Sequence, residues 1–173
     1  TLRIHNEFKI NSKHSLEFGG QLTKNEVDYK YSINDTTTVV SQNDKGFLST
    51  VYLQDKWDPI KNLSIIGGIR ATHFDVSDDI FYEPRLSISY QLNNQVELKG
   101  AWGKYYQFVN RIVREDVSQG SRDFWLLANG NNSPISFSRH SILGVSYEIE
   151  NWLFDIEYFE KEMTGLTEFS LRF

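Results

Sequence analysis

The chain has 173 residues and a formal net charge of −5, with 39% hydrophobic residues, 24% charged residues, 12 Phe, 9 Tyr and 4 Trp. The acidic balance argues against a general nucleic-acid binder, and the aromatic content argues against a disordered chain. The lack of cysteine excludes disulfides, thiol catalysis and thiolate metal sites, and no stretch approaches the roughly 20 apolar residues of a membrane-spanning helix.

Apolar and polar residues alternate along most of the chain, which indicates strands whose two faces meet different surroundings. Segment 81–92 shows this best. Pro84 interrupts it near one end, where the loss of one backbone N–H from the strand pairing is tolerated. No segment carries an apolar stripe of helical period, so no helix is expected. In chain order, the apolar rows of the eight predicted strands lie in 2–10, 16–22, 47–57, 63–71, 82–92, 96–102, 143–149 and 152–158.

Short and longer connections alternate along the chain between these strands. The predicted short connections are 11–15, 58–62, 93–95 and 150–151, and the longer ones are 25–45, 75–80 and 107–136. This regular exchange is typical of outer-membrane barrels, whose periplasmic turns are short and whose extracellular loops are longer. Strands of about ten residues, tilted by about 40°, also match the apolar band of about 25 Å that such barrels present.

A soluble eight-stranded carrier of hydrophobic ligands would share the alternation, so the direction of the apolar face needs separate evidence. Aromatic residues lie toward the ends of the rows, as in the two girdles of a membrane barrel. We expect Trp57, Tyr90, Tyr147 and Trp152 at the periplasmic rim and Phe47, Tyr82, Trp102 and Tyr158 at the outer rim. The charged residues with apolar parity, Asp55, Lys104, Arg139 and Glu160, all fall near strand ends. A Lys or Arg at the midplane would cost about 2–4 kcal/mol, so this distribution favours a membrane barrel.

The order of turns also predicts an orientation. The first strand ends at a short turn, so it runs from the outside toward the periplasm. After eight strands the chain has returned to the side on which it began, so both of its ends are expected on the outside. Complete bacterial barrels have both ends in the periplasm. We therefore expect an internal part of a larger barrel, with a complete small eight-stranded barrel of structural or adhesive role as the alternative.

Several of these segments resemble the barrel strands of TonB-dependent outer-membrane receptors. The resembling segments are 51–57, 63–70, 82–90, 98–108, 144–148 and 158–166. The resemblance implies an all-β fold, in which residues 1–173 form about eight antiparallel strands of a transmembrane barrel of about 22 strands that is plugged by a globular domain. The plug domain and the TonB box are expected outside this segment.

The same resemblance implies a function in the bacterial outer membrane, as wall and extracellular loops of a receptor that imports a ferric siderophore, haem, cobalamin or a glycan. The implied partners are outer-membrane lipid, the receptor's own plug domain, the TonB system and a small-molecule or glycan ligand. No nucleic acid, cofactor or enzymatic activity is expected. An outer-membrane lipase or protease is the remaining alternative, but no nucleophile and base can be placed.

Two groups of residues are candidate contact sites. Loop 107–136 carries guanidinium groups and aromatic rings that suit an anionic chelate or a sugar, although they would also suit packing against other loops or the membrane rim. Its candidate ligand-binding residues are Arg111, Arg114, Arg122, Phe124 and Trp125. Charged residues of opposite parity are expected to line the lumen and face the plug, or to pair across strands. These residues are Arg70, Glu83, Arg85, Glu97, Lys99 and Glu157, together with Glu17 and Lys161.

No metal site is predicted. Asp75, Asp78 and Asp79 form an acidic loop, but it lacks the Gly and the distal Glu of a calcium-binding loop. The four histidines are dispersed and have no metal-ligand spacing.

Overall fold

The computed structural model describes residues 1–33, 37–116, 120–130 and 133–167, and within them it describes all side chains except those in 31–42 and 113–124. The described residues contain no helix, and therefore no helix that is long and apolar enough to cross a membrane. The strands are β1 (Leu2–Lys9), β2 (His14–Ile33), β3 (Thr37–Ile60), β4 (Leu63–Phe74), β5 (Asp79–Gln91), β6 (Val96–Gln107), β7 (Val109–Asp116), β8 (Gly120–Leu127), β9 (Ser136–Ile149) and β10 (Trp152–Thr164).

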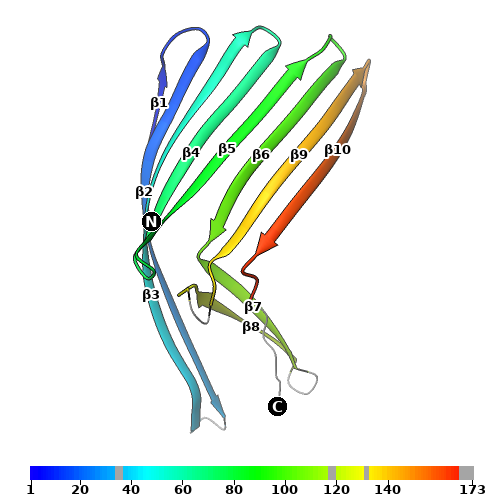
Figure 1. The fold of residues 1–173 in the computed structure, drawn as a ribbon. Helices are drawn as coiled ribbons and strands as arrows, with labels where there is room; N and C mark the ends of the chain where they lie inside the picture. The colour runs from blue at the N-terminus through cyan, green and yellow to red at the C-terminus, as the bar shows by residue number, and fades with distance from the viewer. Residues whose placement is uncertain (34–36, 117–119, 131–132, 168–173) are drawn as a thin grey trace.

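Eight of these strands form one antiparallel sheet in the order β1-β2-β3-β4-β5-β6-β9-β10, while β7 and β8 form a separate two-stranded sheet (Figure 1). The predicted all-β antiparallel fold is thereby confirmed, and the eight predicted strands are those of the large sheet. Within the described residues β1 and β10 do not pair with each other, so the sheet is open. It gives no support to a complete eight-stranded barrel.

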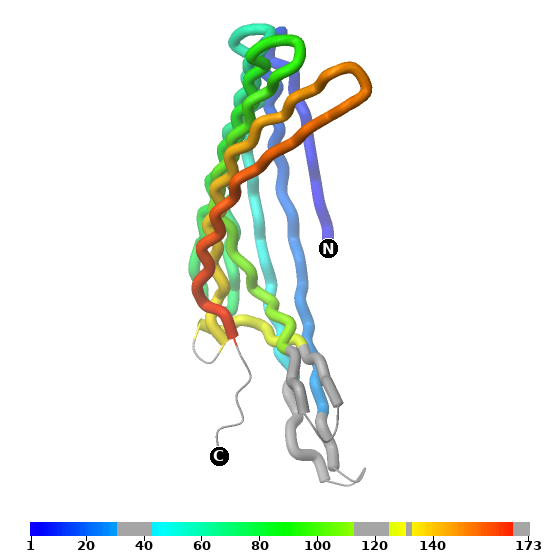
Figure 2. The backbone as a smooth tube through the Cα atoms, turned by 90° about the vertical axis from the view of Figure 1, so that its right-hand side faces the viewer, coloured from blue at the N-terminus to red at the C-terminus, as the bar shows by residue number. Residues whose placement is uncertain are grey.

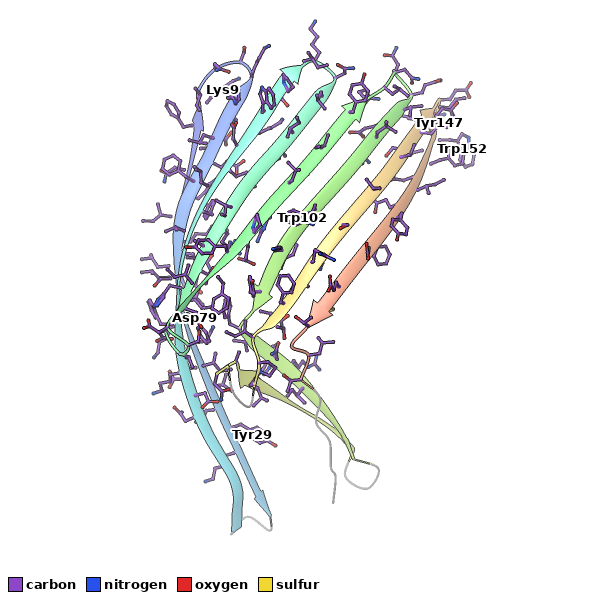
Figure 3. All side chains as sticks on the ribbon, viewed as in Figure 1. Lys9, Tyr29, Asp79, Trp102, Tyr147 and Trp152 are labelled. Carbon is purple, nitrogen blue, oxygen red and sulfur yellow. The ribbon has the colours of Figure 1, made fainter. Side chains whose placement is uncertain are left out.

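The two ends of the sheet differ in their connections (Figures 1 and 2). At the short-turn end, strands are joined through 10–13, 61–62, 92–95 and 150–151. At the opposite, long-hairpin end, β2 and β3 extend together beyond the other strands, and β7 and β8 leave the sheet. Figure 3 shows Tyr147 and Trp152 at the short-turn end and Asp79 where β4 and β5 connect.

The prediction of loops at 25–45 and 107–136 was wrong in part. Strands β2 and β3 remain paired as far as Ile33 opposite Thr37, and 107–136 contains β7 and β8. In the first part of segment 25–45, Val27, Tyr29, Tyr31 and Ile33 alternate with polar residues, and this period-two row was a strand signal that the prediction did not use. Its Val, Thr and Tyr residues also suit an extended backbone.

The large sheet has an apolar face and a polar face, and the apolar face is the more exposed one. Val51 is 63% exposed and Leu143 is 66% exposed, whereas Ser146, on the polar face, is 6% exposed. Side chains converge on the inner side of a curved sheet and splay apart on the outer side. The sheet therefore curves around its polar face, which reverses the arrangement of a soluble carrier.

The long-hairpin end has a hydrophobic cluster of its own, formed by Phe74, Phe108, Leu127 and Ala128. The rings of Phe74 and Phe108 lie 5.0 Å apart between centroids, and Phe74 is fully buried. Phe74 pairs with Leu48 on the polar-face side of the sheet, and Leu48 packs against the cluster. The cluster thus fixes the base of the β7–β8 hairpin on the inner side of the sheet.

Candidate functional site

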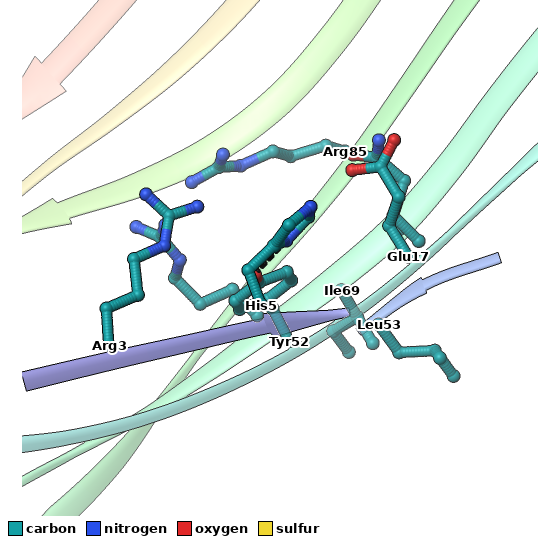
Figure 4. A pocket seen from close by; sticks show the side chains of 10 residues that line it. Arg3, His5, Glu17, Tyr52, Leu53, Ile69 and Arg85 are labelled. Atoms are coloured by element: carbon teal, nitrogen blue, oxygen red, sulfur yellow. Dashed lines mark hydrogen bonds between the residues drawn. The ribbon is translucent and has the colours of Figure 1, made fainter. Parts of the chain in front are cut away.

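A hollow of about 540 Å³ lies on the polar face over strands β1 to β5 (Figure 4). The ladder explains why its residues meet, because His5, Gly19, Tyr52, Arg70 and Glu83 are successive cross-strand partners on five neighbouring strands. The polar residues lining the hollow are Arg3, His5, Glu17, Tyr52, Gln54, Arg70 and Arg85. This polar-face hollow is the first candidate site.

A glycine lets Tyr52 reach across the neighbouring strand. The Tyr52 ring lies over Gly19, where an added Cβ would stand 2.6 Å from the tyrosine hydroxyl. The hydroxyl forms a hydrogen bond of 2.6 Å with Nδ1 of His5, and the two rings are stacked. The Arg3 guanidinium lies 5.9 Å from the centre of the Tyr52 ring, within the range of a cation–π contact. Tyr52 therefore holds both His5 and Arg3 at the edge of the hollow.

A second glycine and tyrosine support Arg85. Its guanidinium lies 4.8 Å from the centre of the Tyr105 ring, and that ring folds back over Gly103, where a Cβ would stand 2.8 Å from the hydroxyl. Among the described residues, Nε of Arg85 is buried and has no hydrogen-bond partner. The Nε–H is enclosed, but the Arg85 side chain is 38% exposed, so other donors of its guanidinium can meet an anionic acceptor.

Glu83 is buried beneath these arginines. Its Oε1 accepts the backbone N–H of Tyr106 at 3.0 Å, while Arg70 and Arg85 approach its two carboxylate oxygens only to 3.9 Å. At that distance the arginines neutralise the carboxylate without forming close hydrogen bonds to it. Pro84, which has no N–H, follows Glu83, and the ladder between β5 and β6 ends at Arg85 opposite Gly103. Beyond the end of this ladder, the Glu83 carboxylate thus accepts the Tyr106 N–H in place of a backbone carbonyl of β5.

The other predicted luminal residues lie on the polar face farther along the sheet. Lys99 lies 3.7 Å from Glu97 and 3.8 Å from Asp155, and Glu97 accepts a hydrogen bond from Ser89. Lys99 and Glu157 line a hollow of about 700 Å³ over β4, β5, β6, β9 and β10. Lys99 thus has one carboxylate partner on its own strand and one on β10.

At the long-hairpin end, the structure places Arg111 opposite Trp125 in the β7–β8 hairpin. Trp125 is 53% exposed and, with Asn25, Asp28 and Val109, lines a hollow of about 600 Å³ between the hairpin and β2. The side chains of Arg114, Arg122 and Phe124 lie outside the described residues. This hairpin hollow is the second candidate site.

Glu26, which also lines the hairpin hollow, lies 3.0 Å from both Lys24 and Lys45. The hydrogen bond from Lys45, followed by that from Lys24, holds the pKa of the Glu26 carboxyl below its usual range. Within the described residues, no three His, Asp or Glu side chains are grouped closely enough for a metal ion. Asp75 and Asp78 have structural partners, because Asp75 accepts the Phe47 N–H and Asp78 bonds to His73.

Sequence reasoning identified Arg70, Glu83 and Arg85 but missed Arg3, His5 and Tyr52 as members of one site. Their parity placed them on the polar face, but only the register across β1, β2 and β3 shows that they meet. Gly19 was the available signal, since a glycine in a strand interior often marks a close approach of another group.

The comparisons with known proteins agree with this fold. The family model of the TonB dependent receptor-like β-barrel matches residues 2–133, and no curated protein matches the chain. The ferric enterobactin receptor PfeA of Pseudomonas aeruginosa, in its G324V mutant, is 17% identical with a TM-score of 0.66, over 92% of this chain and 26% of that one.

Two further solved structures are similar. The siderophore receptor PirA of Pseudomonas aeruginosa is 15% identical with a TM-score of 0.68, over 92% of this chain and 31% of that one. OmpT, an outer membrane protein of Vibrio cholerae, is 14% identical with a TM-score of 0.56, over 94% of this chain and 45% of that one. The chain thus spans about a quarter to a third of the length of the siderophore receptors it matches.

Proposed function

This chain belongs to the family of TonB-dependent receptor β-barrels, and on that premise we propose that it supplies part of the wall and of the extracellular loops of a receptor that imports a bulky, scarce nutrient. The protein belongs to the bacterial outer membrane. In outer-membrane barrels short turns face the periplasm. The short-turn end is accordingly the periplasmic end, and the long-hairpin end is extracellular.

The observation that carries this proposal is that apolar side chains are exposed on one face of the sheet, whereas polar side chains are more buried on the other, the reverse of a soluble protein. An exposed apolar face spans the sheet between two sets of aromatic residues, and the opposite face carries charges that a watery lumen would solvate. A soluble protein with this much exposed apolar surface would aggregate. The family is one of receptors rather than enzymes.

We take a ferric siderophore as the leading ligand class, ahead of haem, cobalamin and glycans. The PfeA and PirA structures are those of siderophore receptors, and one PfeA structure is in complex with enterobactin. In this chain, Arg111 and Trp125 offer a cation and an aromatic ring on one hairpin at the extracellular end, which suits an anionic chelate with aromatic groups.

The test is uptake by cells that carry the full-length receptor as their only transporter of this kind. Radiolabelled ferric siderophores, haem, cobalamin and oligosaccharides are offered in turn. We expect uptake of a ferric siderophore, and we expect Arg111→Ala with Trp125→Ala to weaken its binding by about tenfold or more, since Trp and Arg often dominate binding energy. Trp102→Ala, on the outward face, is the control. Uptake of another class, or equal binding by both variants, would contradict the ligand assignment.

We further propose that the polar-face hollow contacts the plug domain of the full receptor. Arg3, Arg70 and Arg85 present more donors than Glu17 and Glu83 satisfy at hydrogen-bond distance, so carboxylates of the plug would complete the site.

For this contact the measurement is the urea concentration that unfolds a fluorescently labelled plug in the full receptor. Arg3→Ala with Arg85→Ala is expected to weaken the association by about 1.5–3 kcal/mol for each charge-assisted hydrogen bond lost. Lys9→Ala, a polar-face cation outside the hollow, should leave the midpoint unchanged. A midpoint that is the same in all variants would mean that the arginines do not contact the plug.

A further inference from the structure

A carboxylate lies on the outward, apolar face of the sheet near the short-turn end. Asp55 of β3 precedes Trp57 by two positions, and Trp57 is the direct cross-strand partner of His14 of β2. All three have the parity of Leu53, which is 48% exposed, so their side chains leave the sheet on its apolar face. An ionisable group on a face that meets lipid is costly and calls for a partner.

The Asp55 carboxylate is held at the level of the aromatic rim. Its Oδ2 lies 2.7 Å from Nδ1 of His14, and the His14 and Trp57 rings are stacked with their centroids 5.9 Å apart. Because His14 is level with Trp57, this hydrogen bond draws the carboxylate toward the short-turn end. Aromatic side chains of membrane barrels gather at the interface with the headgroups. The carboxylate therefore lies where headgroups of the periplasmic leaflet meet the wall.

The protein satisfies only part of this carboxylate. Among the described residues, Oδ1 of Asp55 is buried and has no hydrogen-bond partner. Oδ2 is shared with His14, but the Asp55 side chain is 36% exposed, and a carboxylate oxygen can accept more than one hydrogen bond. A cationic donor can therefore still reach Oδ2 from outside the sheet.

A glycine leaves room beside the carboxylate. Gly67 of β4 is the cross-strand partner of Asp55, and a Cβ added to it would meet nothing within 4 Å. On the other side of Gly67 stands its partner Leu86 of β5, which is 42% exposed. Trp57 is also 42% exposed and can offer its ring to a cation. The surroundings thus suit a small cationic head attached to an apolar body.

We propose that Asp55, Trp57 and the space over Gly67 bind the primary ammonium headgroup of a phospholipid in the periplasmic leaflet. A primary ammonium can donate a hydrogen bond to the carboxylate and contact the Trp57 ring, whereas a trimethylated ammonium has no proton to donate. Lipid is the source of the ammonium because this face of the sheet is covered by the membrane. The proposal rests on the orientation given under the proposed function and is independent of the imported ligand.

The experiment measures phospholipid retained by the purified full-length receptor in mild detergent, by native mass spectrometry. The lipid probes are phosphatidylethanolamine and phosphatidylcholine with the same acyl chains, and free ethanolamine is the soluble competitor. We expect the wild type to retain phosphatidylethanolamine about threefold to fivefold better, as for one partly exposed ion pair. Asp55→Asn removes the charge and Gly67→Leu fills the space, so each should abolish this preference. Glu160→Gln, which removes a carboxylate from the same face at the long-hairpin end, is the matched control.

A preference for phosphatidylethanolamine that persists in Glu160→Gln and is lost in both Asp55→Asn and Gly67→Leu would support the site. Equal retention of the two lipids by the wild type, or equal effects of Asp55→Asn and Glu160→Gln, would overturn it. Free ethanolamine that displaces the lipid at similar concentration would overturn the lipid assignment. Nutrient uptake by Asp55→Asn cells, expected to be normal, separates a failure of this site from a failure of the proposed function.

Discussion

The membrane-spanning part of the sheet and its long-hairpin end, which we propose is extracellular, use apolar side chains in opposite ways. In the spanning part, residues such as Val51 and Leu143 are exposed on the outer face while polar residues crowd the inner face. At the long-hairpin end, Phe74 of β4 and Leu127 of β8 are buried in one cluster on the inner side. One strand, β4, takes part in both arrangements, because its outward Ile69 is 47% exposed and its Phe74 is fully buried.

The difference shows that the surroundings, rather than the strand, decide which face is apolar. Where lipid covers the outer face, apolar side chains need no protein partner. Where the chain enters water, the hydrophobic effect again requires burial against other protein groups. Substitutions in the full-length receptor can break or sharpen this contrast.

The largest expected effect is that of Phe74→Ala. Deleting a fully buried ring should destabilise the extracellular end by about 3–5 kcal/mol, because it leaves a cavity that the hairpin cannot fill completely. Hydrogen exchange of β7 and β8 amides would rise, while β1 and β10 stay protected as before. Val51→Ala, in the lipid-facing region, is the control and should leave β7 and β8 unaffected. An equal rise in both variants would refute a locally independent core.

A charge placed on the two faces of β5 gives the next largest contrast. Leu86 lies midway between the outward aromatic residues Tyr82 and Tyr90, so Leu86→Arg should cost about 2–4 kcal/mol in lipid bilayers. Ser87→Arg points to the inner face and should cost much less. Denaturant unfolding of the receptor in vesicles would measure both. If the inner-face variant were the less stable, the assignment of the two faces would be wrong.

A smaller effect is expected at Glu83. Glu83→Ala removes the acceptor of the Tyr106 N–H, and an unsatisfied buried donor costs about 1–3 kcal/mol. Glu83→Gln keeps an oxygen acceptor and should retain most of the stability. Exchange of the Tyr106 amide, followed by mass spectrometry, should accelerate in the Ala variant and much less in the Gln variant. Equal rates in both would show that Glu83 does not close the ladder.

The smallest effect concerns pH at Glu26, outside the membrane. Because Lys45 and Lys24 lower the pKa of its carboxyl, Glu26 stabilises the folded hairpin above the usual value of 4.5. That contribution is lost as the pH falls through the lower pKa of the folded state. Protection of the β2 and β3 amides, corrected for the intrinsic pH dependence of exchange, should therefore fall in the wild type as the pH drops below 4.5 and fall less in Glu26→Gln. Identical pH profiles would exclude a role for this carboxyl.

The sequence predicted the spanning strands well because lipid on one side and water on the other impose strict alternation, as in 81–92. It predicted the extracellular end poorly. Phe74 and Phe108 are isolated aromatic residues in their segments, and only the return of the chain through β7 and β8 brings them together. Arg3 and Tyr52 were missed for a similar reason, since a site spread over several strands depends on register.

The early end of the ladder between β5 and β6 has a mechanical consequence. Below Arg85 and Gly103 the two strands are joined by regular backbone pairing, but above them Pro84 contributes no donor and the Glu83 carboxylate holds Tyr106. A force that pulls β5 and β6 apart within the sheet would therefore separate them first at the long-hairpin end. The sheet is thus expected to be stiffer at membrane depth than at its long-hairpin end.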